Sequence, residues 1–122
     1  MQTVHVFVAH GRFRTLEDVH AFVDQTYTDD GEQVTSPFML EIGISSYEPM
    51  CIETRHSPRP VPLLELLRGA SYGEQWLAQL DGSRAAESAI CVFSPNEVAH
   101  PERSSLEYLG ARSYQGKADS II

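Results

Sequence analysis

The alternation of apolar and polar positions along the chain predicts four β-strands. In TVHVFVAH, β-branched residues place Val4, Val6 and Val8 on one face, with further apolar residues on the other. The run ESAICVFS is apolar on both faces, as expected of a strand at the centre of a sheet. LEYLGARSY alternates well enough for a last strand, and Gly110 inside it indicates either a bulge or a close approach of another segment. The predicted strands span residues 3–9, 50–55, 88–94 and 105–113.

Helical spacing and capping residues predict short helices between these strands. Thr15 is expected to cap the first helix, and acidic residues follow it in the first turn, where the helix dipole favours them. The inward stripe of this helix is expected to consist of Leu16, Val19, His20, Val23 and Tyr27. Ser36 and Gly43 are expected to bound a second short helix.

Two more helices are predicted in the second half of the chain. Pro62 favours the start of one helix and Gly69 its end. Ser71 and Glu74 lie three residues apart, which predicts a capping box at the start of the other. The buried stripe of that helix would be Tyr72, Trp76 and Leu80. Trp76 is therefore expected in the core, with a binding anchor as the alternative.

Two segments are predicted to lack regular structure. TDDGEQVT is expected to be a polar loop that turns at Gly31. SPRPVP is expected to be a stiff connection, because its prolines disrupt regular structure. The elements do not alternate as a doubly wound fold requires. The pattern predicts an α+β fold, with a mostly antiparallel four-stranded sheet, helices packed on one face, and a single domain over residues 1–122.

Negative charge is concentrated in the first half of the chain. Residues 15–54 contain nine acidic residues and neither Lys nor Arg, whereas residues 55–122 carry eight acids and seven bases. The net charge of the whole chain is −8. Phosphates would be repelled by such a protein, so nucleic acid and anionic membranes are not expected as ligands. The negative charge could then serve to bind a basic partner, to bind a cation, or only to keep the protein soluble.

The remaining composition indicates a protein of a reducing compartment. The start MQTVHVFVAHG is not typical of a secretion signal, and no apolar run has the length of a membrane span. Cys51 and Cys91 each lie in an apolar, strand-like run, and two cysteines suffice for neither a disulfide framework nor a zinc site. We therefore expect buried, reduced thiols in a cytoplasmic protein.

The sequence contains no motif that identifies a catalytic or metal site. The five histidines, which are His5, His10, His20, His56 and His100, have no ligand-pair spacing. DDGE has adjacent acids, whereas a calcium loop requires oxygens at alternate positions. Neither a nucleophile motif nor a phosphate-binding glycine loop is present. We therefore expect no metal and no cofactor, and scattered structural or surface histidines.

The acidic stretch has two interpretations. A solvated face is the simpler one, because charge on a surface ordinarily serves solubility. Solubility is satisfied by mixed signs, however, and mixed signs are what the rest of the chain has. A field of one sign steers a cationic partner. The absence of bases over forty residues therefore favours a binding surface.

Several segments together resemble a family of bacterial immunity proteins from polymorphic toxin systems, immunity protein twenty-two. They are VHVFVAHG, LEDVHAFVDQTYTDDGE, YEPMCIE, GASYGEQW and LEYLGARSY. The last matches best, through Leu106, Tyr108, Leu109, Gly110 and Tyr114. The third departs from the family pattern. Tyr47, Glu48, Ile52 and Glu53 fit it, but Pro49, Met50 and Cys51 stand where the family has several acids.

The resemblance implies a non-enzymatic, cytoplasmic protein that binds and neutralises a cognate toxin. Many such toxins are nucleases, whose clefts are basic, so an acidic surface would complement them. The expected binding residues are Glu17, Asp24, Tyr27, Asp29, Asp30, Glu32, Tyr47, Glu48 and Glu53. The alternatives are a small enzyme or small-molecule-binding protein that uses histidines and acids in a pocket, and an oligomeric structural module. The sequence does not indicate the oligomeric state.

Overall fold

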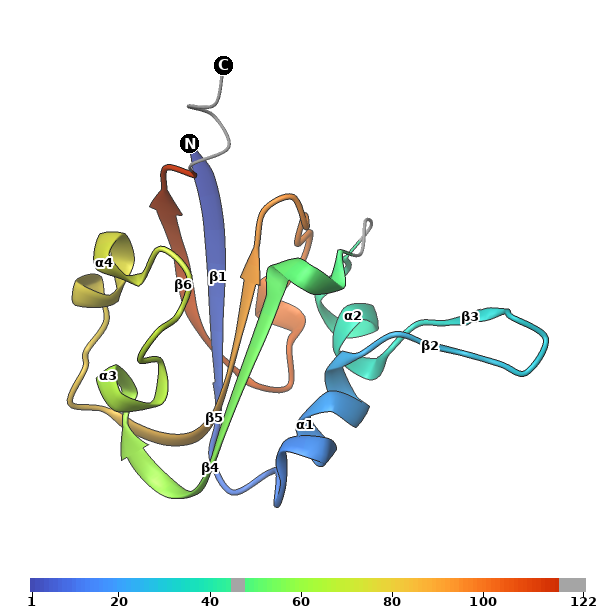
Figure 1. Ribbon diagram of the computed structural model, residues 1–122, viewed down its shortest axis with the longest axis horizontal. Helices are drawn as coiled ribbons and strands as arrows, with labels where there is room; N and C mark the ends of the chain where they lie inside the picture. Colours follow the sequence, from blue (N-terminus) through green and yellow to red (C-terminus); the bar gives the residue numbers. More distant parts are fainter. Residues whose placement is uncertain (45–47, 117–122) are drawn as a thin grey trace.

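The core of the protein is a four-stranded antiparallel sheet with the strand order β4-β5-β1-β6 (Figure 1). The computed structural model describes residues 1–44 and 48–116. The strands are β1 (Gln2–Ala9), β4 (Ile52–Pro62), β5 (Ala85–Phe93) and β6 (Glu107–Tyr114). The predicted α+β class and the four strands are confirmed. The run ESAICVFS lies in β5, between β4 and β1, as its two apolar faces predicted.

The sheet differs from the prediction mainly at β4, which continues through the proline-rich segment. Its pairing with β5 shifts between His56 and Val61, so that four residues oppose a single position of β5. Because β4 is an edge strand, its prolines remove few hydrogen bonds of the ladder, and the expected irregular connection is instead a bulged strand. The bulge expected near Gly110 is present, since the β1–β6 register shifts opposite it and Gly110 has a φ of 101°.

Helices cover both faces of the sheet, rather than the one face that we predicted. Successive residues of a strand point to opposite faces. On β5, Cys91 and Phe93 face a core shared with α3 (Leu63–Leu66) and α4 (Gly73–Trp76). Ile90 and Val92 face a second core, shared with α1 (Leu16–Val23) and α2 (Pro37–Ile42). Figure 1 shows the two helix pairs on opposite sides of the strands.

The caps of α1 and α2 form as predicted. The Thr15 side chain accepts a hydrogen bond from the Asp18 amide, and the Ser36 side chain accepts one from the Met39 amide. Gly43 ends α2 in the left-handed conformation at φ 69°. The inward stripe of α1 is narrower than expected. Val19 and Val23 are fully buried, but Leu16, His20 and Tyr27 are not.

The predicted capping box before α4 does not form. Tyr72 occupies the capping position with a φ of 56°, and no side chain caps the helix. Ser71 instead donates hydrogen bonds to the carboxylate of Glu53 on β4. Trp76 lies in the core as expected, fully buried, with its indole N–H donating to the Ser71 carbonyl oxygen at 3.0 Å. The 3-10 helix η2 (Leu77–Gln79) follows α4, and the others are η1 (Pro49–Cys51) and η3 (Pro101–Arg103).

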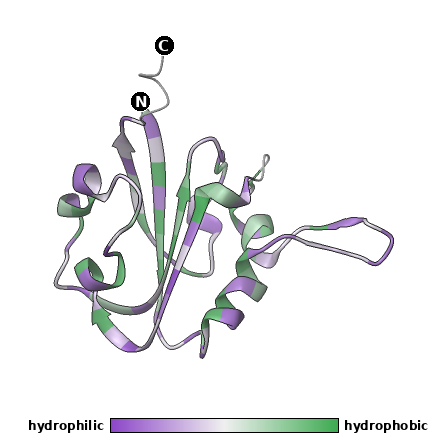
Figure 2. Cartoon of the chain, in the orientation of Figure 1, coloured by the Kyte–Doolittle hydropathy of each residue, from purple (hydrophilic) through white to green (hydrophobic). Residues whose placement is uncertain are grey.

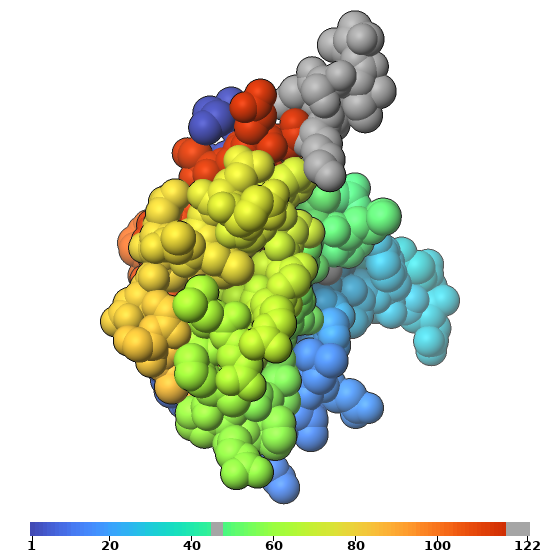
Figure 3. All heavy atoms as spheres, turned by 60° about the vertical axis from the view of Figure 1, so that its left-hand side comes forward, coloured from blue at the N-terminus to red at the C-terminus, as the bar shows by residue number. Residues whose placement is uncertain are grey.

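The segment predicted as a polar loop is a β-hairpin of β2 (Thr26–Tyr27) and β3 (Gln33–Val34). It extends from the body of the molecule in both views, in cyan in Figure 3 (Figures 1 and 3). All residues from 26 to 34 are exposed, and Figure 2 shows mostly hydrophilic or intermediate colours there. The hairpin therefore contributes little to the core. Over the residues described, the structure contains no helix with the length and apolarity of a membrane span.

Candidate partner-binding site

Most of the predicted binding residues fall on one side of the molecule. Helix α1 leads directly into the β2–β3 hairpin, and both lie on the right-hand side of Figure 1. We call this region the α1–hairpin surface. Its acidic members are Glu17, Asp18, Asp24, Asp29, Asp30 and Glu32. Its exposed aromatic residue is Tyr27, whose accessible surface is 65% of the maximum.

The hairpin turn holds three of these acids at its tip. The Gly31 amide donates to the Thr28 carbonyl oxygen at 2.9 Å, and the Thr28 amide donates to the Glu32 carbonyl oxygen at 2.9 Å. Gly31 has a φ of 83°, a conformation that glycine adopts without strain. Asp29 and Asp30 therefore occupy the bend, with Glu32 next to them. Among the described residues, these three acids take part in none of the ion pairs.

Asp24, at the end of α1, is paired with His20. The His20 Nδ1 lies 2.9 Å from an Asp24 carboxylate oxygen, and both side chains are close to half exposed. One helical turn separates the two residues, so they share a face of α1. The predicted position of His20 on the buried stripe is therefore wrong, and this pairing was not predicted from the sequence. The spacing of four residues could have indicated it.

A hollow of about 360 Å³ lies beside this pair. Tyr27 lines it from the hairpin, and Pro49, Ile52 and Thr54 line it from η1 and the start of β4. The hollow combines a carboxylate, an imidazole and an aromatic ring at an exposed surface. Such a combination suits a polar segment of a partner, with Tyr27 as the apolar contact.

The structure places Glu48 beside this surface, but in a structural role. The Asn96 side chain is buried and holds the Glu48 backbone, accepting from its amide at 2.7 Å and donating to its carbonyl oxygen at 3.1 Å. The Glu48 carboxylate accepts a hydrogen bond from the Met50 amide and so caps η1. Asn96 therefore positions η1 at the edge of the sheet. Tyr47, the residue before, lies outside the described residues.

Glu53 does not join the α1–hairpin surface. It pairs in register with Cys91 and so points to the face of α3 and α4. One carboxylate oxygen lies 3.6 Å from an Arg55 nitrogen. The carboxylate also accepts hydrogen bonds from the Ser71 amide, at 3.2 Å, and from the Ser71 hydroxyl. Its charge is thus directed to the opposite face from Asp24.

Two arginines lie at the start of α1, next to the acidic residues. The guanidinium carbon of Arg12 lies 4.3 Å from the centre of the Phe22 ring, a cation–π contact. The Arg14 amide donates to an Asp18 carboxylate oxygen at 3.2 Å. The Arg12 guanidinium thus lies against a residue near the end of α1, and the base-free part of the surface is the hairpin.

The described residues contain no group of three or more side chains suited to holding a metal ion. The two thiols are free. Burial raises the pKa of the Cys91 thiol to about 12. Burial, followed by the nearby charges of Glu48 and Glu53, also raises the pKa of Cys51. Cys51 is only partly buried, whereas we expected both thiols to be largely buried. Both thiols are therefore poor nucleophiles at neutral pH.

Comparison with known proteins identifies one family. The family model described as Immunity protein 22 matches residues 6–115, which is most of the chain. Searches of curated proteins and of solved structures gave no significant match. The matched region runs from β1 to the end of β6 and includes α1, the hairpin and η1. The chain therefore belongs to the Immunity protein 22 family.

Proposed function

We propose that this protein binds a cognate toxin through the α1–hairpin surface and blocks it without catalysing a reaction. Membership of the immunity family supports a toxin-neutralising role in general. The observation that carries the choice of surface is the hairpin, because it projects from the body, is exposed throughout and has an acidic tip free of ion pairs among the described residues.

A basic cleft, such as that of a nuclease, is the partner surface that this hairpin fits. The tip would present three carboxylates where such a cleft binds phosphates, and the attraction would raise the association rate. Tyr27 would provide the apolar contact area behind the tip, since tyrosine is enriched at interfaces. We place this interaction in the cytoplasm, where the free thiols of the chain would remain reduced.

The alternative function, a small enzyme or small-molecule-binding protein, has its support in the His20–Asp24 pair beside the hollow. A carboxylate that orients an imidazole is a recurrent part of acid–base sites. Under this alternative, His20→Ala would abolish function. Under our proposal, the same variant should still neutralise the toxin, because His20 adds one polar contact at an exposed position.

The binding surface is tested by substituting Tyr27. The partner in this experiment is the cognate toxin domain, and the dissociation constant is measured by calorimetry. Tyr27→Ala should weaken binding by about 10- to 30-fold, the effect of a hot-spot residue of about 2 kcal/mol.

The control is Leu64→Ala, since Leu64 is comparably exposed, at 52% against 65%, but lies on α3, across the sheet. It should bind as the unsubstituted protein does. Equal affinities for the two variants would place the interface elsewhere.

A further inference from the structure

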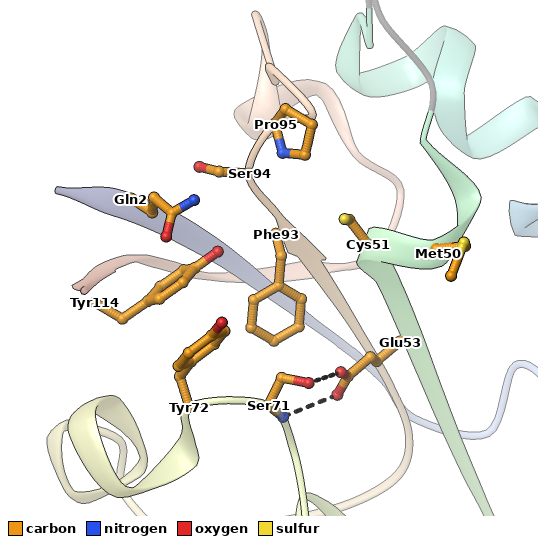
Figure 4. A pocket seen from close by; sticks show the side chains of 10 residues that line it. All are labelled: Gln2, Met50, Cys51, Glu53, Ser71, Tyr72, Phe93, Ser94, Pro95 and Tyr114. Carbon is orange, nitrogen blue, oxygen red and sulfur yellow. Dashed lines mark hydrogen bonds between the residues drawn. The ribbon is translucent and has the colours of Figure 1, made fainter. Parts of the chain in front are cut away.

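A second hollow, of about 280 Å³, opens at one end of the sheet on the face of α3 and α4 (Figure 4). Five segments far apart in the sequence line it, namely the start of β1, η1 with the start of β4, the loop before α4, the end of β5 and the end of β6. We call it the aromatic pocket. The ridge formed by η1 separates it from the first hollow, because Pro49 lines that hollow whereas Met50 and Cys51 line this one.

Three aromatic rings form one side of the aromatic pocket. The rings of Tyr72 and Tyr114 stack with their centres 4.7 Å apart, and the Phe93 ring meets Tyr114 edge-on at 5.7 Å. Phe93 and Tyr114 are buried, so the position of these rings is fixed by the core. The π-electron faces of such rings attract cations.

Among the described residues that line the pocket, Glu53 provides the one charged side chain. Figure 4 shows its carboxylate held by the two hydrogen bonds from Ser71. This arrangement gives Ser71 its role, in place of the capping box that the sequence predicted. A carboxylate offers about four lone-pair positions, so further donors can still bind it. The Glu53 side chain remains 23% exposed, and the 3.6 Å separation leaves Arg55 beyond hydrogen-bonding distance.

Two other titratable groups that line the pocket, the Cys51 thiol and the Tyr114 hydroxyl, have raised pKa values. Burial raises the pKa of Cys51, and the charges of Glu48 and Glu53 raise it further. Burial also raises the pKa of the Tyr114 hydroxyl, with smaller contributions from Tyr72 and Cys51 in the same direction. For Cys51, the smaller contribution from the Glu48 and Glu53 charges has the sign of a negative local potential, which a bound cation would relieve.

We propose that the aromatic pocket receives an arginine side chain of the partner protein, with the guanidinium bound to Glu53 and lying against the tyrosine rings. Arginine fits better than lysine, because a planar guanidinium both stacks on aromatic faces and binds a carboxylate through two hydrogen bonds. The volume lies just below the range of about 300–1,000 Å³ for small-molecule sites, which suits a single side chain. Met50, 88% exposed at the rim, would provide an adaptable apolar contact.

This inference rests on the proposed function for the identity of the partner, but the pocket can be tested without the toxin. The probe is Nα-acetyl-L-arginine N-methylamide, titrated into the full chain and followed by NMR. We expect saturable shifts of the Ser71 amide, which donates to Glu53, and of the Trp76 indole N–H, which donates to the Ser71 carbonyl oxygen. The dissociation constant should be in the millimolar range, which corresponds to a binding free energy of about −4 kcal/mol.

The corresponding citrulline derivative is the matched probe, since it has the same shape without the charge. It should bind at least tenfold more weakly. The variant Glu53→Gln, which retains an acceptor for Ser71, should reduce arginine binding to the level of citrulline. Exposed Glu65→Gln should leave arginine binding unchanged. Equal binding of the two probes, equal binding of arginine and lysine derivatives, or no saturable shift would overturn the proposal.

The toxin complex provides the second arm of the test. Glu53→Gln should weaken the complex by about tenfold, and an Arg→Ala scan of the toxin should find one arginine whose loss is not additive with it. Failure of this arm while Tyr27→Ala still weakens binding would reject the pocket and leave the proposed function standing. Saturable arginine binding by a protein that does not bind the toxin would reject the proposed function instead.

Discussion

At the scale of the residue, the surroundings of a side chain decided its role more than its type did. Asp24 and Glu53 belong to the same acidic stretch, yet one is paired with His20 at the surface and the other is held by Ser71 on the far side of the sheet. Composition revealed the excess of acids but not this division. Strand alternation could have predicted that Glu53 and Ile52 point to opposite faces of the sheet, because neighbouring residues of a strand do so.

His5 provides a test at this scale. Burial lowers the pKa of His5 below its ordinary value of 6.5, and its Nδ1 lies 2.9 Å from the Tyr108 hydroxyl. Below pH 6.5 the unfolded chain binds a proton that the folded protein excludes. The stability associated with His5 is therefore complete above pH 6.5 and is lost as the pH falls towards the lowered pKa.

The measurement is the free energy of unfolding in urea at about pH 7.5 and about pH 5.5, for the unsubstituted protein and for His5→Gln. The substitution should reduce the loss on acidification by no more than about 1 kcal/mol, because solvent screens a half-buried ring. An identical loss in both proteins, or an NMR titration of His5 with a pKa above 6.5, would show that burial does not control this group.

At the scale of the element, local signals predicted the strands and the helix caps but not their arrangement. Thr15, Ser36 and Gly43 act on the nearest turn of chain, so spacing alone locates them. Which face of the sheet a helix covers depends on contacts between distant segments, and we predicted one face where both are covered. Because β5 has apolar residues on both faces, both faces of the sheet had to be covered by other elements.

The hairpin could also have been predicted. TDDGEQV places a glycine in a five-residue turn between Tyr27 and Gln33, a pattern of hairpins with three- to five-residue loops. Its polarity alone predicts a loop, and this prediction is wrong. The aromatic pocket could not have been predicted, because its lining comes from five separate segments and the Ser71–Glu53 contact competes with a local capping motif.

Matched substitutions on the two faces test the two-sided core. Phe38 and Trp76 are both fully buried, one on α2 and one on α4. Phe38→Ala and Trp76→Ala should each lower the free energy of unfolding by about 3–5 kcal/mol, through lost burial and the cavity that remains.

Exposed Leu40 on α2 is the control for this pair, and Leu40→Ala should change stability by less than about 0.5 kcal/mol. If either variant is too unstable to purify, Phe38→Leu and Trp76→Phe give the same comparison with a smaller loss in the free energy of unfolding. A cost near zero on one face would mean that the helices there do not share the core.

At the scale of the whole molecule, the fold brings several residues of the acidic stretch to one side. The acidic residues of α1 and of the hairpin lie on one side, whereas Arg55 and Arg84 pair with carboxylates of the sheet rather than with the hairpin tip. A projecting tip of one sign acts over about one Debye length, roughly 8 Å at physiological salt. Its effect on a basic partner would therefore be mainly on the rate of association.

The central claim, that the hairpin tip steers a basic toxin, is tested by the association rate measured against ionic strength. Asp29→Asn/Asp30→Asn removes two charges from the tip, and Glu65→Gln/Glu74→Gln removes two exposed charges from α3 and α4. At low salt the tip variant should associate about tenfold more slowly, the deficit should shrink as salt is added, and the control should associate nearly as fast as the unsubstituted protein. Equal slowing of both variants, or of neither, would contradict the claim.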